Sequence, residues 1–316
     1  MKAMNFDFVG KKKWFALFSL VILMIGLVCN IVLKTQLDIQ FAGGTIAKYS
    51  YTGDITEEEV HQALQGVTDG SQTIEFSYDV IVAGELTSLN YMTITLSTDM
   101  STEELQQMTQ ALEKAFEQNN IVLSESSTVE ATMGRDFFIK CLVAIALAAV
   151  LMLIYVAIRF RKIGGWSAGL MALVALLHDI LIAYFAFVIF GIELDDNFVA
   201  VVLSILGYSL NSTIVIFDRI RENRRLMGGQ FSLDEIVNKS INQSFKRALH
   251  TSISTFIAVS CITGVALFYG LDSILSFSIP MMVGIAFGFY SSVFLSTPLW
   301  VGLRNWISAR KAAKAV

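Results

Sequence analysis

The sequence contains few of the residues that build disulfide frameworks and zinc sites. Its three cysteines, Cys29, Cys141 and Cys261, lie in separate apolar runs, with no Cys-x-x-Cys pair and no Cys/His cluster. Disulfide frameworks and zinc sites need such spacings. We therefore expect each cysteine to be a small buried hydrophobe, and we expect no metal and no other cofactor.

Charged residues are also scarce. They make up 16% of the 316 residues, while 54% are hydrophobic. This composition is too apolar for an ordinary soluble protein. The sequence also lacks a catalytic-triad pattern and a phosphate-binding loop. We therefore expect a membrane protein and not an enzyme.

Six apolar runs are long enough to cross a membrane as helices. The first, Trp14 to Leu33, follows three consecutive lysines. A cleaved signal peptide is the alternative, but the run spans about 20 residues and lacks an A-x-A-like cleavage site, which favours an uncleaved anchor. The other five runs cover residues 137–158, 166–190, 197–217, 248–270 and 276–301. The sequence thus predicts a polytopic α-helical membrane protein with six transmembrane helices, one before and five after a large loop.

The distribution of basic residues predicts the orientation. Of the 23 lysines and arginines, 18 lie on one side of the predicted membrane. The positive-inside rule places that side, with both termini, in the cytoplasm. The predicted divisions are a cytoplasmic N-terminus with the first helix at 1–34, an extracytoplasmic domain at 35–136, a five-helix bundle at 137–303 with a cytoplasmic loop at 218–247, and a cytoplasmic basic tail at 304–316.

The extracytoplasmic segment is acidic and has the pattern of a folded α+β domain. It holds 17 Asp and Glu against three basic residues, which argues against a nucleic-acid partner. Two S/T-x-x-E capping boxes, which begin at Thr56 and Ser101, each predict a helix start. The predicted strands are Ile46–Tyr51, Ile74–Val82, Leu89–Ser97 and Ile121–Val129. The order β-α-β-β-α-β predicts a ferredoxin-like fold.

Two adjacent glycines stand near the start of this domain, in the run Phe41-Ala42-Gly43-Gly44-Thr45. Between a membrane helix and a strand, they allow positive φ angles and a close approach of the backbone. A nucleotide-binding glycine loop is the alternative, but neither a lysine nor a helix start follows. We therefore interpret Gly43 and Gly44 as a structural motif.

The third predicted helix contains His178 and Asp179, about 14 residues and roughly 21 Å from its cytoplasmic end. Ionisable groups near the middle of a membrane are costly and mark functional sites by default. The alternative is a neutral polar pair that holds the helix packing. The sequence leaves both interpretations open.

The fourth predicted helix lies in the stretch from Val201 to Asn223, which reads VVLSILGYSLNSTIVIFDRIREN. Small and polar residues interrupt its apolar part at Gly207, Ser209, Asn211, Ser212 and Thr213. Such groups need partners on neighbouring helices, so we expect this stretch to face the interior of the bundle. Asp218 and Arg219 then mark the end of the helix at the headgroup surface.

A further capping box, Ser232 to Glu235, predicts a short helix that lies along the membrane surface. It leads into the fifth membrane helix, where Arg247 is either a positive-inside anchor or a gating or ion-pairing residue. Ser252, Ser254 and Thr255 are expected to be hydrogen-bond partners for the fourth helix.

These motifs resemble those of the SecF family, auxiliary subunits of the bacterial Sec protein-export machinery within the RND superfamily. The family pattern in the fourth helix is similar to G-Y-S-x-N-D-T-x-x-x-F-D-R-x-R-E-N, and this chain matches it from Gly207 to Asn223 with one departure. Ser212 stands where the family has an intramembrane aspartate. The Phe-x-Gly-Gly start of the outer domain and the His-Asp pair of the third helix are similar as well.

The resemblance implies a subunit that works with a SecD-like partner beside the SecYEG channel and helps translocating preproteins cross the bacterial plasma membrane, driven by the ion-motive force. The missing aspartate is the expected proton carrier of the family, and serine cannot titrate near neutral pH. A titratable step would then depend mainly on the partner, with Asp179 and His178 as the fallback inside this chain. Two alternatives stay open, namely half of an RND-type proton-driven exporter and a non-coupling scaffold subunit.

Two groups of residues follow from the motifs and the resemblance together. The candidates for transport or ion coupling are Asp179, His178, Asn211, Ser212, Thr213, Arg247 and Ser252. The structural-motif residues are Gly43, Gly44, Gly207, Asp218 and Arg219.

Overall fold

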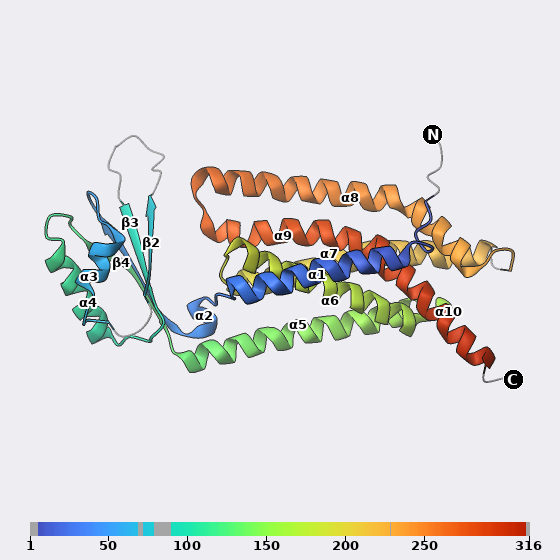
Figure 1. Ribbon diagram of the computed structural model, residues 1–316, viewed down its shortest axis with the longest axis horizontal. Coiled ribbons are helices and arrows are strands. Elements are labelled where there is room, and N and C mark those ends of the chain that lie inside the picture. Colours follow the sequence, from blue (N-terminus) through green and yellow to red (C-terminus); the bar gives the residue numbers. More distant parts are fainter. Residues whose placement is uncertain (1–5, 69–71, 79–89, 228, 314–316) are drawn as a thin grey trace. The chain divides into compact units, whose positions relative to one another are not determined.

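The structure is a computed structural model that describes residues 6–68, 72–78, 90–227 and 229–313 (Figure 1). The chain divides into two compact units. One unit is Leu37–Leu142, and the other joins the residues up to Gln36 with Val143–Val316. The two units are described in turn.

The unit Leu37–Leu142 contains a four-stranded antiparallel sheet. Its strands are β1 (Gly44–Tyr51), β2 (Gln72–Tyr78), β3 (Asn90–Leu96) and β4 (Val122–Val129), in the order β2-β3-β1-β4. Helix α3 (Glu57–Ala63) connects β1 to β2, and helix α4 (Thr102–Ala115) connects β3 to β4. This connectivity and strand order confirm the predicted ferredoxin-like fold. The predicted strand residues 79–82 and 89 lie outside the described residues.

Both helices of this unit pack against one face of the sheet (Figure 1). The strands bury alternate residues, among them Tyr49 of β1 and Ile94 of β3, which meet Val60 of α3 and Met108 of α4 in one core. A period of two in the strands and a single apolar face on each helix produce this layer. At the start of α4, the Ser101 backbone N–H and hydroxyl donate to Glu104 and hold the pKa of that carboxyl below its usual value.

The glycine pair at the entrance of β1 has the predicted backbone conformation. Gly43 has a φ angle of 83° and Gly44 one of 140°. A Cβ atom on Gly43 would overlap the backbone of Ala131, and one on Gly44 would overlap the carbonyl oxygen of Leu96. Larger residues are therefore excluded at both positions by the backbone angle and by lack of space.

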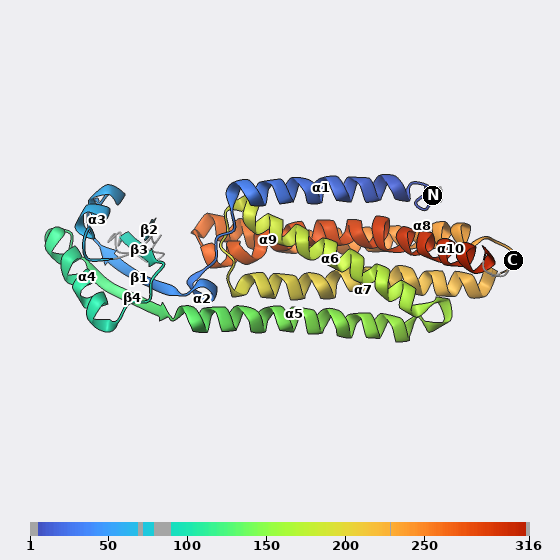
Figure 2. The same ribbon diagram turned by 60° about the horizontal axis from the view of Figure 1, so that its bottom comes forward.

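Within the described residues, six helices are long and apolar enough to cross a membrane, as predicted (Figure 2). The first five are α1 (Lys12–Leu33), α5 (Ala131–Arg159), α6 (Gly165–Phe190), α7 (Asp196–Met227) and α8 (Leu233–Tyr269). The sixth begins as α9 (Asp272–Tyr290), passes through a π-helix η2 (Ser291–Ser296) and continues as α10 (Thr297–Ala313). Two short helices complete the chain, α2 (Ile39–Ala42) and η1 (Arg161–Ile163).

Helices α7 and α8 are longer than the helices predicted from the apolar runs. Helix α7 does not end at Asp218 but continues to Met227, and ion pairs three residues apart on its surface support this extension. The predicted short surface helix after Ser232 is wrong, because α8 is one continuous helix from Leu233 to Tyr269. No glycine or proline stands between Leu233 and Thr263 to interrupt the backbone hydrogen bonds.

Helix α9 packs closely on α7 through two glycines at GxxxG spacing. A Cβ on Gly284 would overlap the side chain of Ile205, and one on Gly288 would stand in contact with Ser209 and Tyr208. Small residues at this spacing let two membrane helices approach closely. The contact fixes α9, and the segment η2 that follows it, against α7, so that the buried polar groups described below can meet.

The prediction that all three cysteines are buried is wrong. Cys261 is exposed on α8, and Cys29 and Cys141 are half-buried. An apolar run in a membrane helix has an outward face that no other helix covers, so the apolar sequence around a cysteine does not by itself indicate burial.

The autonomous fold of the outer domain generates the first prediction. A fragment of residues 35–136 should be soluble and should unfold in one cooperative transition. Replacing the core residue Met108 by alanine should lower its free energy of unfolding by about 2–5 kcal/mol. Gln107→Ala, on the exposed side of the same helix, should change it by less than about 0.5 kcal/mol. Chemical denaturation followed by circular dichroism measures both, and a fragment without cooperative unfolding would refute the assigned fold.

Candidate functional site

Asp179 of α6 is a fully buried carboxyl group that joins three elements of the helix bundle. Ser209 of α7 donates a hydrogen bond from its hydroxyl to Oδ2 of Asp179 at 2.6 Å. Ser291, the first residue of η2, donates to the same oxygen at 2.7 Å. On the other side, Nδ1 of His178 lies 3.0 Å from Oδ1. The polar groups that a membrane interior penalises are therefore paired with one another.

The π-helix η2 supplies the second half of this arrangement. Ser292 donates to the backbone carbonyl of Ser209 at 3.0 Å, and the hydroxyl of Thr213 donates to Ser292 at 3.0 Å. Both Ser291 and Ser292 are fully buried although they are adjacent in sequence. We call the six residues His178, Asp179, Ser209, Thr213, Ser291 and Ser292 the polar cluster. Single π-helical turns within α-helices occur frequently at functional sites.

His178 contributes a second titratable group to the polar cluster. Its ring lies 6.3 Å from the ring of Phe287 and 6.2 Å from that of Tyr290, measured between centroids. Its Nε2 atom is buried and has no hydrogen-bond partner among the described residues. A tautomer that donates from Nδ1 to Asp179 leaves this second nitrogen as an unpaired acceptor.

The polar residues of α7 divide between two faces of the helix. Ser209 and Thr213 are four residues apart and both lie in the polar cluster, whereas Gly207 and Asn211, also four apart, are exposed. The expectation that this stretch faces the bundle interior is therefore wrong for Asn211. A step of two residues on a helix turns the side chain by about 200°, which places it on the opposite face.

Ser212 is buried, but it lies outside the hydrogen-bonded polar cluster. Its hydroxyl is 3.4 Å from the carbonyl oxygen of Tyr208 in the same helix, a long contact. Asp179 reaches α7 at Ser209, three residues or about 4.5 Å along the axis from Ser212. The two positions thus differ in depth by less than one helical turn.

Ser252 joins α8 to α7. The hydroxyl of Tyr208 donates to Ser252 at 2.6 Å, and Ser252 donates to the carbonyl of Ala248 in its own helix. Thr255 donates within α8, to the carbonyl of Thr251, and Ser254 is exposed. Of the three residues expected to bond to the fourth helix, Ser252 is the one that the structure places in contact with α7.

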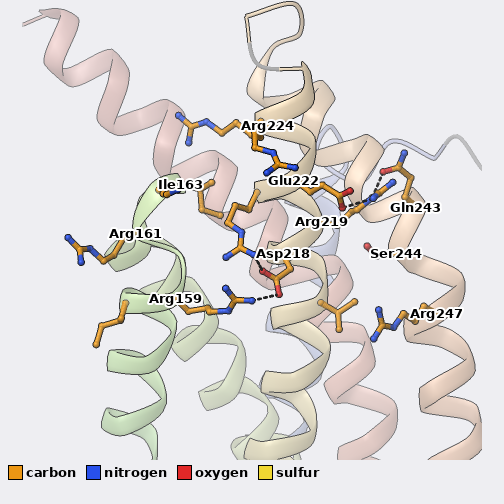
Figure 3. A pocket seen from close by; sticks show the side chains of 15 residues that line it. Arg159, Arg161, Ile163, Asp218, Arg219, Glu222, Arg224, Gln243, Ser244 and Arg247 are labelled. Atoms are coloured by element: carbon orange, nitrogen blue, oxygen red, sulfur yellow. Dashed lines mark hydrogen bonds and ion pairs between the residues drawn. The ribbon is translucent and has the colours of Figure 1, made fainter.

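A separate cavity of about 1330 Å³ lies where α5 ends and α7 and α8 run past it (Figure 3). On α7, Asp218 pairs with Arg159 of α5 at 3.1 Å and with Arg221 at 2.9 Å. Arg219 pairs with Glu222 at 2.6 Å, and Arg247 extends from α8 toward α7 without an ion pair among the described residues. We call this space the basic cavity.

The candidate residues predicted from the sequence therefore do not form one site, because some lie in the polar cluster and others in the basic cavity. His178, Asp179 and Thr213 meet in the polar cluster, and Asp218, Arg219 and Arg247 line the basic cavity. The two sites are connected by α7, on which Ser209 and Asp218 are nine residues or about 13.5 Å apart. Among the described residues, no group of three His, Cys, Asp or Glu side chains could hold a metal ion.

Sequence reasoning did not find Ser291 and Ser292, two central members of the polar cluster. A signal was present, because Ser291, Ser292, Ser296 and Thr297 interrupt an otherwise apolar run. Hydroxyl groups in a membrane helix need partners on other helices. The same argument that selected the fourth helix would have selected this segment.

Comparison with known proteins gives a consistent result. Residues 107–306 match the model of the family described as protein export membrane protein SecD/SecF, C-terminal. The chain is 30% identical to the protein translocase subunit SecF of Petrotoga mobilis, over 95% of this chain and 96% of that protein. It is 31% identical to SecF of Sebaldella termitidis, over 98% and 96%.

Longer proteins match the chain over part of their length. The protein translocase subunit SecDF of Bacillus subtilis is 30% identical over 95% of this chain but only 38% of its own length. A crystal structure of SecDF from Thermus thermophilus, described as a translocon-associated membrane protein, aligns with a TM-score of 0.76 and 25% identity. The alignment covers 96% of this chain and 39% of that structure. The chain thus spans about two fifths of these longer proteins.

The geometry of the polar cluster generates the second prediction. Ser291→Ala removes a hydroxyl that donates to buried Asp179, and this should lower the stability of the helix bundle by roughly 0.6–1.7 kcal/mol, from the average to the largest value measured for hydrogen bonds between membrane helices. Ser212→Ala is the matched control, because its hydroxyl makes only a long contact within its own helix, and it should cost less than about 0.5 kcal/mol. Unfolding by sodium dodecyl sulfate in mixed micelles measures both changes. Equal losses would contradict the assigned hydrogen bonds.

Proposed function

The chain belongs to the SecD/SecF protein-export family. We propose that it is a SecF-like subunit that assists protein export across the bacterial plasma membrane together with a SecD-like partner. Its coverage of its relatives supports this proposal. The chain spans nearly the whole of the SecF relatives but only 38% of the Bacillus subtilis SecDF. A SecD-like partner, as a separate subunit, would correspond to the part of SecDF that this chain does not span.

The observation that carries the proposal is an open face on α7, a helix otherwise packed within the bundle. Ala200, Ser204, Gly207 and Asn211 are exposed along one line of this helix, at intervals of three or four residues. A Cβ atom on Gly207 would meet no atom within 4 Å. We call these four residues the outer stripe of α7.

The chemistry of the outer stripe suits contact with another membrane helix. Small residues allow close approach of two helices, and the amide of Asn211 gains from a hydrogen-bonding partner in an apolar environment. Within the described residues, Asn211 has no such partner. A second subunit that presents a similar helix would cover the stripe and supply one.

The orientation proposed here follows the positive-inside rule, with both termini in the cytoplasm. The ferredoxin-like domain then lies outside, where preproteins emerge from the SecYEG channel. Its excess of acidic residues keeps it soluble beside anionic lipid. Its role in this proposal is contact with the translocating preprotein.

For energy coupling, we propose that the main titratable step resides in the partner, because Ser212 cannot carry a proton at the family's aspartate position. Within this chain, Asp179 and His178 are the groups that can respond. An ionised Asp179 accepts from both Ser209 and Ser291, whereas a protonated one has a proton to donate and must rearrange these bonds. Such a change acts at once on α6, α7 and η2, which makes the polar cluster suited to converting protonation into helix movement.

Contact through the outer stripe generates the third prediction. Gly207→Leu should reduce co-purification of the SecD-like partner roughly tenfold, because overpacking a close contact costs about 1–3 kcal/mol. Gly264→Leu is the matched control, since a Cβ at that glycine of α8 also meets no atom within 4 Å. Partner recovery per mole of this chain, after mild-detergent purification, is the measurement. Normal recovery with Gly207→Leu would show that the partner does not use this face.

The polar cluster generates the fourth prediction. In vesicles with the reconstituted complex, removing the partner's intramembrane carboxylate should abolish proton-driven export. Asp179→Asn should lower the export rate without dissociating the complex, because it removes the charge but keeps the shape of the side chain. Ser212→Ala should leave export near the unmodified rate.

Three outcomes would change the proposal. Unchanged export with Asp179→Asn would make this chain the non-coupling scaffold, an alternative that the serine at position 212 favours. A large loss with Ser212→Ala in an intact complex would assign a direct role to that hydroxyl. Loss of the partner with Asp179→Asn would show that the polar cluster serves assembly instead.

A further inference from the structure

The basic cavity has a charge opposite to that of the whole chain. The chain carries a formal net charge of −4, yet eight basic side chains and only two carboxylates line this one space. The basic residues are Arg159, Arg161, Lys162, Arg219, Arg221, Arg224, Arg225 and Arg247. Like charges in a concave site focus the field and favour a bound anion.

The two carboxylates do not satisfy these cations. Asp218 is shared by Arg159 and Arg221, and Glu222 pairs with Arg219. Within the described part of the chain, the other five basic side chains have no carboxylate within ion-pair distance. The positive-inside rule explains basic residues on one side of a membrane, but not their convergence on a single cavity.

The cavity is also amphipathic along the helix axes. Ile158, the residue before Arg159 on α5, is 64% exposed and lines its wall, and Val215 lines it three residues before Asp218 on α7. Ile158 and Val215 thus lie nearer the middle of their helices than the cations of α5 and α7, whereas Ile163 lies among the charged residues (Figure 3). A phospholipid in a bilayer leaflet has the same order of apolar chain and charged phosphate.

The outer stripe of α7 runs into this cavity. Gly207, Asn211 and Asp218 lie on one line of the helix, so the face that is open in the apolar region continues to the charged region. Arg159 on α5 and Arg247 on α8 stand on opposite walls at the charged end (Figure 3). Cations from two helices that share no ion pair in the described part of the chain therefore line one cavity.

We propose that the basic cavity binds the phosphate headgroup of an anionic phospholipid of the cytoplasmic leaflet. The assignment of the leaflet rests on the orientation given under the proposed function; the binding site itself rests on the cavity. Arginine suits this role because its guanidinium donates two parallel hydrogen bonds to a phosphate. Asp218 holds Arg159 and Arg221 in place at the cavity wall. In the complex, the bound lipid fills the space between the charged ends of α5 and α8.

The test compares two pairs of substitutions in the purified full chain. Arg159→Gln with Arg247→Gln removes one cation from each wall and leaves Asp218 paired with Arg221. Arg310→Gln with Lys311→Gln removes the same charge from α10, outside the cavity. Native mass spectrometry measures binding of short-chain phosphatidylglycerol, with phosphatidylcholine of the same chain length and glycerol 3-phosphate as comparison probes.

The unmodified chain and the α10 pair should bind phosphatidylglycerol more tightly than phosphatidylcholine. The cavity pair should bind phosphatidylglycerol about 25-fold more weakly, about fivefold for each cation removed. Equal binding of phosphatidylglycerol by both pairs, or no preference over phosphatidylcholine, would overturn the proposal. Glycerol 3-phosphate binding as tightly as the lipid would overturn the lipid part and leave a site for soluble phosphates.

A second measurement separates lipid from a protein occupant. The complex with the SecD-like partner should retain phosphatidylglycerol after delipidation in mild detergent, and the cavity pair should lose it. Exclusion of the lipid by the partner would show that acidic groups of the partner fill the cavity. Lipid binding by the isolated chain does not depend on assembly or export, so this result is distinguishable from failure of the proposed function.

Discussion

The pairing of one buried carboxyl group constrains the rest of the helix bundle. A charged side chain at the centre of a membrane helix costs about 2.5–3.5 kcal/mol on insertion scales. Hydrogen bonds between membrane helices contribute about 0.6 kcal/mol on average and up to about 1.7 kcal/mol, so the two from Ser209 and Ser291 offset part of such a cost. They do so only if α7 and η2 both approach α6 at the depth of Asp179. The close packing of α9 on α7, through Gly284 and Gly288, and the π-helical turn at Ser291 meet that requirement.

Helix α7 contacts the polar cluster on one side and has an open face on the other. The helical period determines which of its residues lie on each side. Ser209 and Thr213 point into the polar cluster, while Gly207 and Asn211 lie on the opposite, open face. The family motif that looks like a single polar run is therefore divided between two surfaces of one helix. A change in the polar cluster that moves α7 would also displace the outer stripe on the same helix. It would displace Asp218 of the basic cavity as well, which lies about 13.5 Å from Ser209 along α7.

Much of the fold could be predicted from the sequence, because the features that determine it are local. Apolar length identified six helices, and the capping boxes at Thr56 and Ser101 with alternating strands identified the ferredoxin-like domain. The exposure of Asn211 was predictable from helical period and was missed because neighbouring polar residues were treated as one group. The π-helix was not predictable by pattern, since a shift in backbone hydrogen bonding at Ser291 leaves no trace in hydrophobic periodicity. The predicted division of α8 is wrong because the start of an apolar run, here at residue 248, does not mark the start of a helix.

Ser212 lies in a part of α7 whose neighbouring side chains bond to two other elements. The residues around it remain polar or small, since Thr213 bonds to Ser292 and Tyr208 bonds to Ser252. These bonds join α7 to η2 and to α8, and each would persist whether position 212 carried a serine or a carboxylate. Asp179, the carboxyl group of the polar cluster, is attached to α6 and not to α7. Protonation of Asp179 would alter the contact of α6 with α7 and η2. A carboxylate at position 212 would instead belong to α7, the helix that bears the outer stripe. This difference in attachment supports the proposal that the main titratable step resides in a partner.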